Sequence, residues 1–136
     1  MRIATSALDA IRAHGEEGFP YEVCGLLVGH PDQKLITEVR RLQNVEKEQP
    51  EIRYQVDNRE DMQVRKELRK TDLEVVGYYH SHPNHGAYFS KTDTERAWES
   101  YLYVVLSVRE GRSDDLKAFV AEKDRGPMRP EPVEEV

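Results

Sequence analysis

The alternation of hydrophobic and polar residues predicts the elements of the first half of the chain. Apolar residues repeat at helical spacing after Thr5 or Ser6, so we expect a first helix that one of these hydroxyls caps and that Gly15 and Gly18 end. The apolar run at 23–29 lies between two prolines and predicts a strand buried on both faces. Two further strands are expected near 34–42 and 52–56.

The second half begins with a helical pattern and continues mainly with strands. Asp57 or Asn58 can cap a second helix, which has Met62 and Leu68 on its apolar side. The segment 73–79 indicates a central strand that runs directly into a histidine-rich segment. A third helix is expected at 93–100, followed by strands at 102–108 and 116–121 with a polar turn at 110–113 between them.

Helices interspersed among six strands predict an α/β fold of two or three layers. A length of 136 residues suits one domain. Residues 125–136 contain three prolines and a glutamate-rich end, a composition that builds no packed core, so we expect them to be frayed or loosely docked. We therefore divide the chain into a domain at 1–122 and a C-terminal tail at 123–136.

Composition and charge narrow the range of functions. The chain has 20 basic and 26 acidic residues, and a net charge of −6 repels a phosphate backbone. The basic cluster around Arg65 and Arg69 alternates with acidic residues, which is typical of a solvated helix face. No apolar run approaches the roughly 18 residues that span a bilayer, and the N-terminus has no signal-peptide block. We expect a cytoplasmic protein that binds neither nucleic acid nor membrane.

The single cysteine, Cys24, limits the metal chemistry. It cannot form a disulfide within the chain or a zinc site built on paired cysteines, so any zinc ligands must be histidines and carboxylates. A nucleophilic thiol is the alternative. A cysteine within an apolar strand is more typical of the core, and we favour that interpretation.

Three of the five histidines lie within six positions, at His80, His82 and His85. Residues at i and i+2 of an extended segment point to the same side, so His80 and His82 can direct their imidazoles at one point. Pro83 favours extended backbone at His82. His85 has the character of an exposed loop residue, and we exclude it from the predicted site.

Asp93 can supply a third ligand, because the seven residues 83–89 are long enough to fold it back beside the histidines. Two nitrogens and one carboxylate oxygen leave a fourth tetrahedral position for water, which is typical of a catalytic zinc site. Asp93 also fits a helix-capping role within residues 92–95. The His-x-His pattern is followed by seven residues, then Ser90, two residues and Asp93. This combined pattern favours the metal site over the cap alone.

These residues resemble the signature of the JAMM/MPN+ zinc metalloprotease family, in its short bacterial form. Glu22 stands where the family has an upstream glutamate, and residues 20–29 and 53–57 resemble the family's first strand and a strand-to-helix step. The resemblance covers most of residues 1–122. It implies an α/β fold with a mixed, mostly antiparallel curved sheet of about six strands flanked by about three helices, as in MPN and cytidine-deaminase-like folds.

The resemblance also implies a role for each residue of the predicted site. The metal ligands would be His80, His82 and Asp93, and the cofactor would be Zn²⁺. Glu22 would act as general base on the zinc-bound water. Ser90 would donate its hydroxyl to that water or to the developing oxyanion, and its alternative role as a helix N-cap is compatible with this.

The activity that the resemblance implies is hydrolysis at the C-terminal Gly-Gly of a ubiquitin-like protein, and short links between elements favour a sulfur-carrier protein over polyubiquitin. A Gly-Gly tail has no Cβ atoms and can thread a narrow channel, which Tyr88 and Phe89 can help to wall. The alternatives are a non-catalytic MPN scaffold and a RadC-like protein. The carrier, the released group, the metal loaded in the cell and the oligomeric state stay open.

Overall fold

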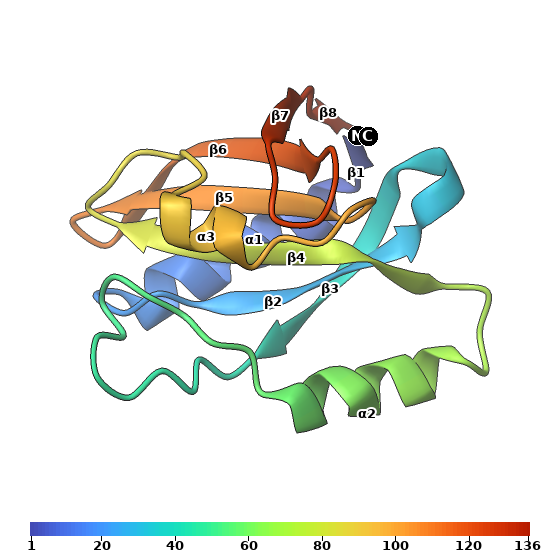
Figure 1. Ribbon diagram of the computed structural model, residues 1–136, viewed down its shortest axis with the longest axis horizontal. Helices are drawn as coiled ribbons and strands as arrows, with labels where there is room; N and C mark the ends of the chain where they lie inside the picture. The colour runs from blue at the N-terminus through green and yellow to red at the C-terminus, as the bar shows by residue number, and fades with distance from the viewer.

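The computed structural model describes residues 1–136 and contains eight strands and three helices (Figure 1). The strands are β1 (Arg2–Ile3), β2 (Cys24–His30), β3 (Leu35–Leu42), β4 (Glu74–Pro83), β5 (Leu102–Arg109), β6 (Arg112–Ala121), β7 (Met128–Glu131) and β8 (Glu134–Glu135). The helices are α1 (Thr5–Gly18), α2 (Asn58–Leu68) and α3 (Lys91–Glu95), with a 3-10 turn η1 (Pro31–Gln33).

All eight strands belong to one mixed sheet, in the order β7-β6-β5-β4-β2-β3-β1-β8. Four of its seven strand pairs are antiparallel, and the pair of β4 with β5 near the centre is parallel. The predicted fold class is therefore confirmed, with eight strands in place of about six.

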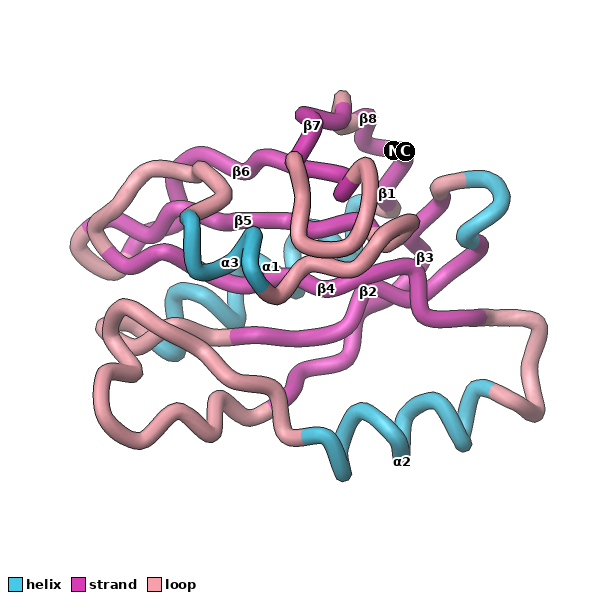
Figure 2. The backbone as a smooth tube through the Cα atoms, in the orientation of Figure 1, coloured by secondary structure: helices cyan, strands magenta, loops and turns pink.

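The helices lie on opposite sides of the sheet, as the tube in Figure 2 shows. On one side, α1 packs against β3, β4, β5 and β6 and buries Leu8 and Ile11 in the larger core. On the other side, α2 packs against β3 and β4, and α3 lies near β4 in Figure 1. The side of the sheet opposite α1 is the one that carries the predicted site.

The central strand β2 is buried on both faces, as its apolar run predicts. Leu27 contributes to the core under α1, whereas Leu26 and Val28 contribute to the smaller core under α2. A Cβ at Gly25 would approach the ring of Tyr79 to 2.3 Å. Glycine at this position therefore lets the Tyr79 side chain pass across β2.

Two predictions for the first half of the chain are wrong. Residues 52–56 form no strand: only an isolated bridge joins Val56 to Asn44. The N-cap of α1 is Ala4, whose side chain cannot accept a hydrogen bond, and the Thr5 hydroxyl donates instead to Glu135 in the C-terminal segment. Both differences arise from partners that are distant in sequence.

Two helices also differ from their prediction. Met62 of α2 is 70% exposed, and the buried positions of α2 are Asp61 and Leu68. The cap of α2 is Asp57, as predicted, and it accepts a hydrogen bond from the amide of Arg59. Helix α3 begins at Lys91 and ends at Glu95, so it is earlier and shorter than the predicted 93–100.

The C-terminal residues are paired and not frayed, contrary to their composition. β7 pairs antiparallel with β6, and β8 pairs parallel with β1. Pro130 is tolerated because β7 is an edge strand, where a missing backbone N–H removes no ladder hydrogen bond. Lys34 and Glu131 add an ion pair at 3.1 Å. No helix of the structure is both long enough and apolar enough to cross a membrane.

Candidate metal centre

Strand β4 continues through the histidine pair, so His80 and His82 project from the same face of the sheet. Their neighbour Tyr79 points the other way, into the core under α1. Register with β5 places His80 opposite Val105 and His82 opposite Ser107. Both imidazoles are buried, with exposed fractions of 0% and 5%.

The three predicted ligands converge. The Nε2 atoms of His80 and His82 are 3.2 Å apart, and Asp93 Oδ2 lies 3.0 Å from the first and 3.3 Å from the second. Tetrahedral ligands at roughly 2.0–2.1 Å from a zinc ion would be about 3.3 Å from one another. The spacing of the three donor atoms therefore fits a zinc ion.

The first turn of α3 holds Asp93 in place. The Ser90 hydroxyl oxygen accepts from the Asp93 amide at 3.0 Å, and the Ser90 amide donates to Asp93 Oδ2 at 3.1 Å. This capping box is built by Ser90 and Asp93 and not by the predicted residues 92–95. Asp93 can therefore cap α3 and belong to the cluster at the same time.

Different contacts orient the two imidazoles. Nδ1 of His82 lies 3.0 Å from the Gly86 carbonyl oxygen, to which it can donate, so that its Nε2 lone pair faces the cluster. Nδ1 of His80 is buried without a hydrogen-bond partner. The His80 ring instead stacks on Tyr54 at a centroid distance of 4.5 Å and meets the edge of Phe89 at 6.0 Å. Aromatic packing therefore fixes its orientation.

Glu22 lies just before β2 and is 95% buried, with an exposed fraction of 5%. A carboxylate oxygen of Glu22 and a ring nitrogen from each of His80 and His82 lie within 4.8 Å of one another. Oε1 of Glu22 has no hydrogen-bond partner. The next residue, Val23, donates its amide to the Ser81 hydroxyl at 2.9 Å, which holds the start of β2 against the histidine strand.

Burial, charge and hydrogen bonds together set the protonation of the cluster. Burial raises the pKa of Glu22 to about 9, an effect that Asp93 reinforces and Arg96 opposes. Burial also lowers the pKa of His80. Burial opposes ionisation of Asp93, but hydrogen bonds and charge from the neighbouring histidines keep its pKa well below the ordinary value. A neutral His80 and an ionised Asp93 are the forms that bind metals.

The types of donor atom in this cluster also suit a divalent metal. Two imidazole nitrogens with one carboxylate oxygen suit zinc better than magnesium, which prefers oxygen ligands and several waters. The buried, unpartnered Oε1 of Glu22 is a polar atom that a nearby cation or a bound water would stabilise.

Asn44, which no sequence pattern marks, connects Glu22 to the loop before α2. Its Nδ2 donates to the carbonyl oxygens of Glu22 and Arg53, both at 3.0 Å, and its Oδ1 accepts from the amides of Glu46 and Gln55. All four hydrogen-bonding positions of the amide are thus used. Nothing in the local sequence around Asn44 indicates partners so far along the chain.

Cys24 and His85 lie outside the cluster. Cys24 is buried, and burial raises the pKa of its thiol to about 12, so that it stays protonated and serves as a core residue. His85 is exposed, and its carbonyl oxygen accepts a hydrogen bond from the Ser107 hydroxyl.

Comparison with known proteins agrees with this fold. A desampylase from Haloferax volcanii is 36% identical over 112 residues, which cover 79% of this chain and 80% of the desampylase. The CysO-cysteine peptidase of Mycobacterium tuberculosis is 30% identical over 118 residues, which cover 86% and 80%. A solved structure from Desulfitobacterium hafniense matches with a TM-score of 0.84 and 28% identity, over 100% of this chain and 93% of that one.

The curved mixed sheet and its buried His-x-His strand define a hydrolase of the JAMM metallopeptidase type. Residues 4–121 match the family described as prokaryotic homologs of the JAB domain, and the chain belongs to this family.

Proposed function

We propose that this chain is a zinc-dependent peptidase that cuts after the C-terminal Gly-Gly of a ubiquitin-like sulfur-carrier protein. The observation that carries the proposal is the convergence of donor atoms from His80, His82 and Asp93 within 3.3 Å, beside the buried Glu22. A non-catalytic scaffold would be expected to lack at least one of these side chains. The presence of all four favours an enzyme.

In this proposal His80, His82 and Asp93 hold the zinc ion. When bound, zinc supplies a Lewis acid that polarises the scissile carbonyl and lowers the pKa of water to about 7. Glu22 takes a proton from the attacking water and gives it to the leaving amine nitrogen as the C–N bond breaks. Burial raises the pKa of Glu22 to about 9, and Glu22 can accept this proton once a nearby positive charge has lowered that value.

In this proposal Ser90 stabilises negative charge on the carbonyl oxygen. Its hydroxyl oxygen already accepts from the Asp93 amide, which leaves the hydroxyl proton available for donation. A donor that is held in place before the reaction needs no rearrangement when charge develops. The N-cap role and the catalytic role therefore support each other.

Two observations support the proposed substrate: the aromatic side chain beside the cluster and the name of one relative. Tyr88 is 51% exposed and packs edge-on against His82 at 5.0 Å, so that an aromatic wall stands beside the cluster. In this proposal the carrier tail passes along this wall, where glycines bring the backbone close to the metal. One relative is named a CysO-cysteine peptidase, which supports a peptidase of a related kind here.

The test is cleavage of small sulfur-carrier proteins extended past their Gly-Gly by the zinc-loaded enzyme, with product masses measured by mass spectrometry. We expect a single cut after the second glycine. Replacing that glycine should slow turnover more than replacing the residue beyond it. Equal tolerance on both sides of the cut, or cleavage inside unfolded casein, would indicate a general peptidase with an open cleft.

A further inference from the structure

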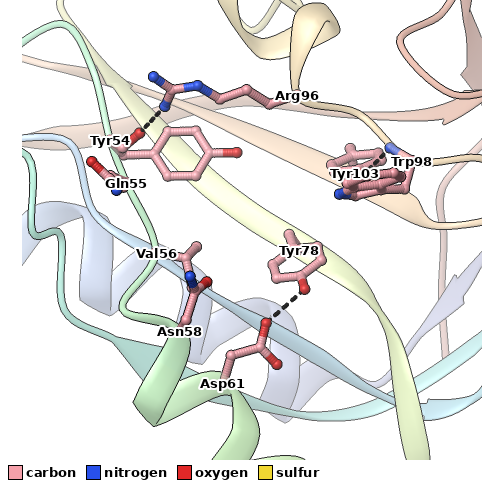
Figure 3. A pocket seen from close by; sticks show the side chains of 9 residues that line it. All are labelled: Tyr54, Gln55, Val56, Asn58, Asp61, Tyr78, Arg96, Trp98 and Tyr103. Atoms are coloured by element: carbon pink, nitrogen blue, oxygen red, sulfur yellow. Dashed lines mark hydrogen bonds between the residues drawn. The ribbon is translucent and has the colours of Figure 1, made fainter.

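A pocket of about 380 Å³ lies beside the candidate metal centre, on the α2 side of the sheet (Figure 3). Tyr54 joins the two, because its ring stacks on His80 and also lines the pocket. This volume is near the lower end of the roughly 300–1,000 Å³ typical of ligand pockets. It suits one small molecule or a single amino-acid residue.

Four of the nine residues that line the pocket are aromatic. Tyr54, Tyr78 and Tyr103 line it together with Trp98, which is 56% exposed. The Trp98 amide donates to the Tyr103 hydroxyl at 2.7 Å, so these two walls are fixed to each other. The faces of these rings give an apolar side chain a surface on which to pack.

The one carboxylate in the pocket is neutralised within the protein. Asp61 Oδ1 accepts from Arg65 Nε at 2.6 Å, and Oδ2 accepts from the Tyr78 hydroxyl at 2.7 Å, the latter drawn as a dashed line in Figure 3. Both oxygens are thus engaged. Asp61 therefore offers little attraction to an amine and serves as part of the pocket's support.

Arg96, in contrast, is a cation without a partner anion. It lies directly after α3 and donates from one nitrogen, Nη1, to the Tyr54 carbonyl oxygen at 2.6 Å. Figure 3 shows its side chain along the edge of the pocket, with the guanidinium at Tyr54. This bond steadies the guanidinium and leaves its other N–H groups for an anion, for which arginine is well suited.

Resting on the proposed function, we propose that this pocket binds the leaving group, an α-amino acid with an apolar side chain whose carboxylate pairs with Arg96. Hydrolysis adds water across the scissile C–N bond, leaves the carrier with a terminal carboxylate, and releases the amine nitrogen with its new proton. In a released α-amino acid the carboxylate carbon is two bonds from that nitrogen. In an isopeptide-linked lysine, four methylenes follow the nitrogen instead. Arg96 therefore selects a peptide-linked single amino acid over a modified lysine.

The chain provides its own probe for this proposal, because Trp98 is its single tryptophan. Fluorescence of the zinc-loaded protein is followed during titration with L-leucine and with L-leucinamide, which lacks the carboxylate. We expect a saturable change with L-leucine and an affinity for the amide that is lower by about tenfold or more, since a hydrogen bond to a charged group contributes roughly 1.5–3 kcal/mol.

The variant Arg96→Gln should remove the preference for L-leucine, because glutamine keeps a donor for Tyr54 but carries no charge. Arg96→Lys should retain part of it. Arg53→Gln is the matched control, since Arg53 is an exposed arginine next to Tyr54 that does not line the pocket. The preference of this variant should equal that of the unmodified protein. Equal binding of the acid and the amide, no saturable change with L-leucine, or a preference that survives Arg96→Gln would overturn the proposal.

Cleavage assays separate this proposal from the proposed function. Carriers ending in Gly-Gly-Leu and in Gly-Gly-leucinamide are compared, and the free acid should be cut faster. Cleavage of both carriers at equal rates would support the proposed peptidase function and refute the proposed role of the pocket. Selective binding of L-leucine without cleavage of either carrier would support amino-acid binding in the pocket and refute the proposed peptidase function.

Discussion

At the scale of single residues, Asp93 combines a structural and a proposed chemical role in one oxygen atom. Its Oδ2 accepts from the Ser90 amide and lies within 3.3 Å of both imidazole nitrogens. The same hydrogen bonds that keep its pKa low also fix its direction. Removing the charge of Asp93 should therefore weaken metal binding, whereas a change at Glu22 should lower the reaction rate.

We expect Glu22→Gln to retain zinc and to lose activity by about 10²-fold or more, since general-base catalysis typically contributes 10²–10⁴-fold. Asp93→Asn should instead weaken zinc binding itself, because an amide oxygen is a poorer ligand than a carboxylate. Metal content and turnover are measured on the same preparations. Full activity of both variants with metal bound would contradict the two roles.

His14 should make stability depend on pH. Its Nδ1 lies 2.7 Å from the Tyr79 hydroxyl, and burial lowers its pKa to about 4, with Arg41 adding to this effect and Glu17 opposing it. In the unfolded chain the pKa of histidine is about 6.5. Between these two values the unfolded chain binds more protons, so this contribution to stability is complete above about pH 6.5 and is lost as the pH falls through 4.

The measurement for His14 is the urea midpoint of the protein and of His14→Gln between pH 7 and 4. The protein should lose more stability than the variant over this range, because glutamine does not titrate. Other groups contribute equally to both curves. If the two midpoints fell in parallel, His14 would have no part in the pH dependence.

At the scale of elements, the parallel pairing of β4 with β5 positions the histidine pair. Gly77 faces Leu102 in this ladder, and a Cβ at Gly77 would lie 1.7 Å from the Leu102 carbonyl oxygen. Backbone cannot yield as a flexible side chain can. The sequence Val-Val-Gly-Tyr-Tyr therefore contains a glycine that the close approach of β5 requires.

We expect Gly77→Ala to destabilise the protein by about 2–4 kcal/mol, because the two strands must separate to admit the methyl group. The matched control is Gly86→Ala, whose Cβ would meet only Tyr88 Cδ1 at an ordinary 3.6 Å. That change should stay within about 0.5 kcal/mol. Urea unfolding measures both, and equal effects would show that the contact with β5 does not limit the choice of residue.

At the scale of the whole molecule, the candidate centre joins segments that are far apart in the chain. Glu22 precedes β2, His80 and His82 belong to β4, and Asp93 belongs to α3. A metal that binds these residues only in the folded state stabilises the entire fold by mass action. It also reduces the repulsion between Glu22 and Asp93 that contributes to the high pKa of Glu22.

We therefore expect about one zinc per chain after reloading, and a lower thermal midpoint after removal of zinc with a chelator. The midpoint of Asp93→Asn should respond less to the chelator, since that variant binds zinc weakly. Elemental analysis and thermal unfolding are the measurements. A stoichiometry near zero would exclude the proposed metal chemistry.

Several features of the fold were predictable because they depend on neighbours in sequence. The apolar run of β2, the Asp57 cap of α2 and the alternation that directs His80 and His82 to one face all follow from local spacing. Met62 was not predictable, because α2 turns toward β4 to place Asp61 against Tyr78. That contact joins residues 17 positions apart.

The sequence by itself determined the donor types, their order and their spacing, because ligand chemistry and strand alternation are properties of the local chain. Only the tertiary structure decided which atoms meet. Asn44 reaches Glu22 and Gln55, Tyr54 reaches His80, and the proline-rich end completes the sheet by pairing with β6 and β1. The physical reason is that buried hydrogen bonds and ring contacts depend on distances in space, which residue spacing does not fix when long loops separate the partners.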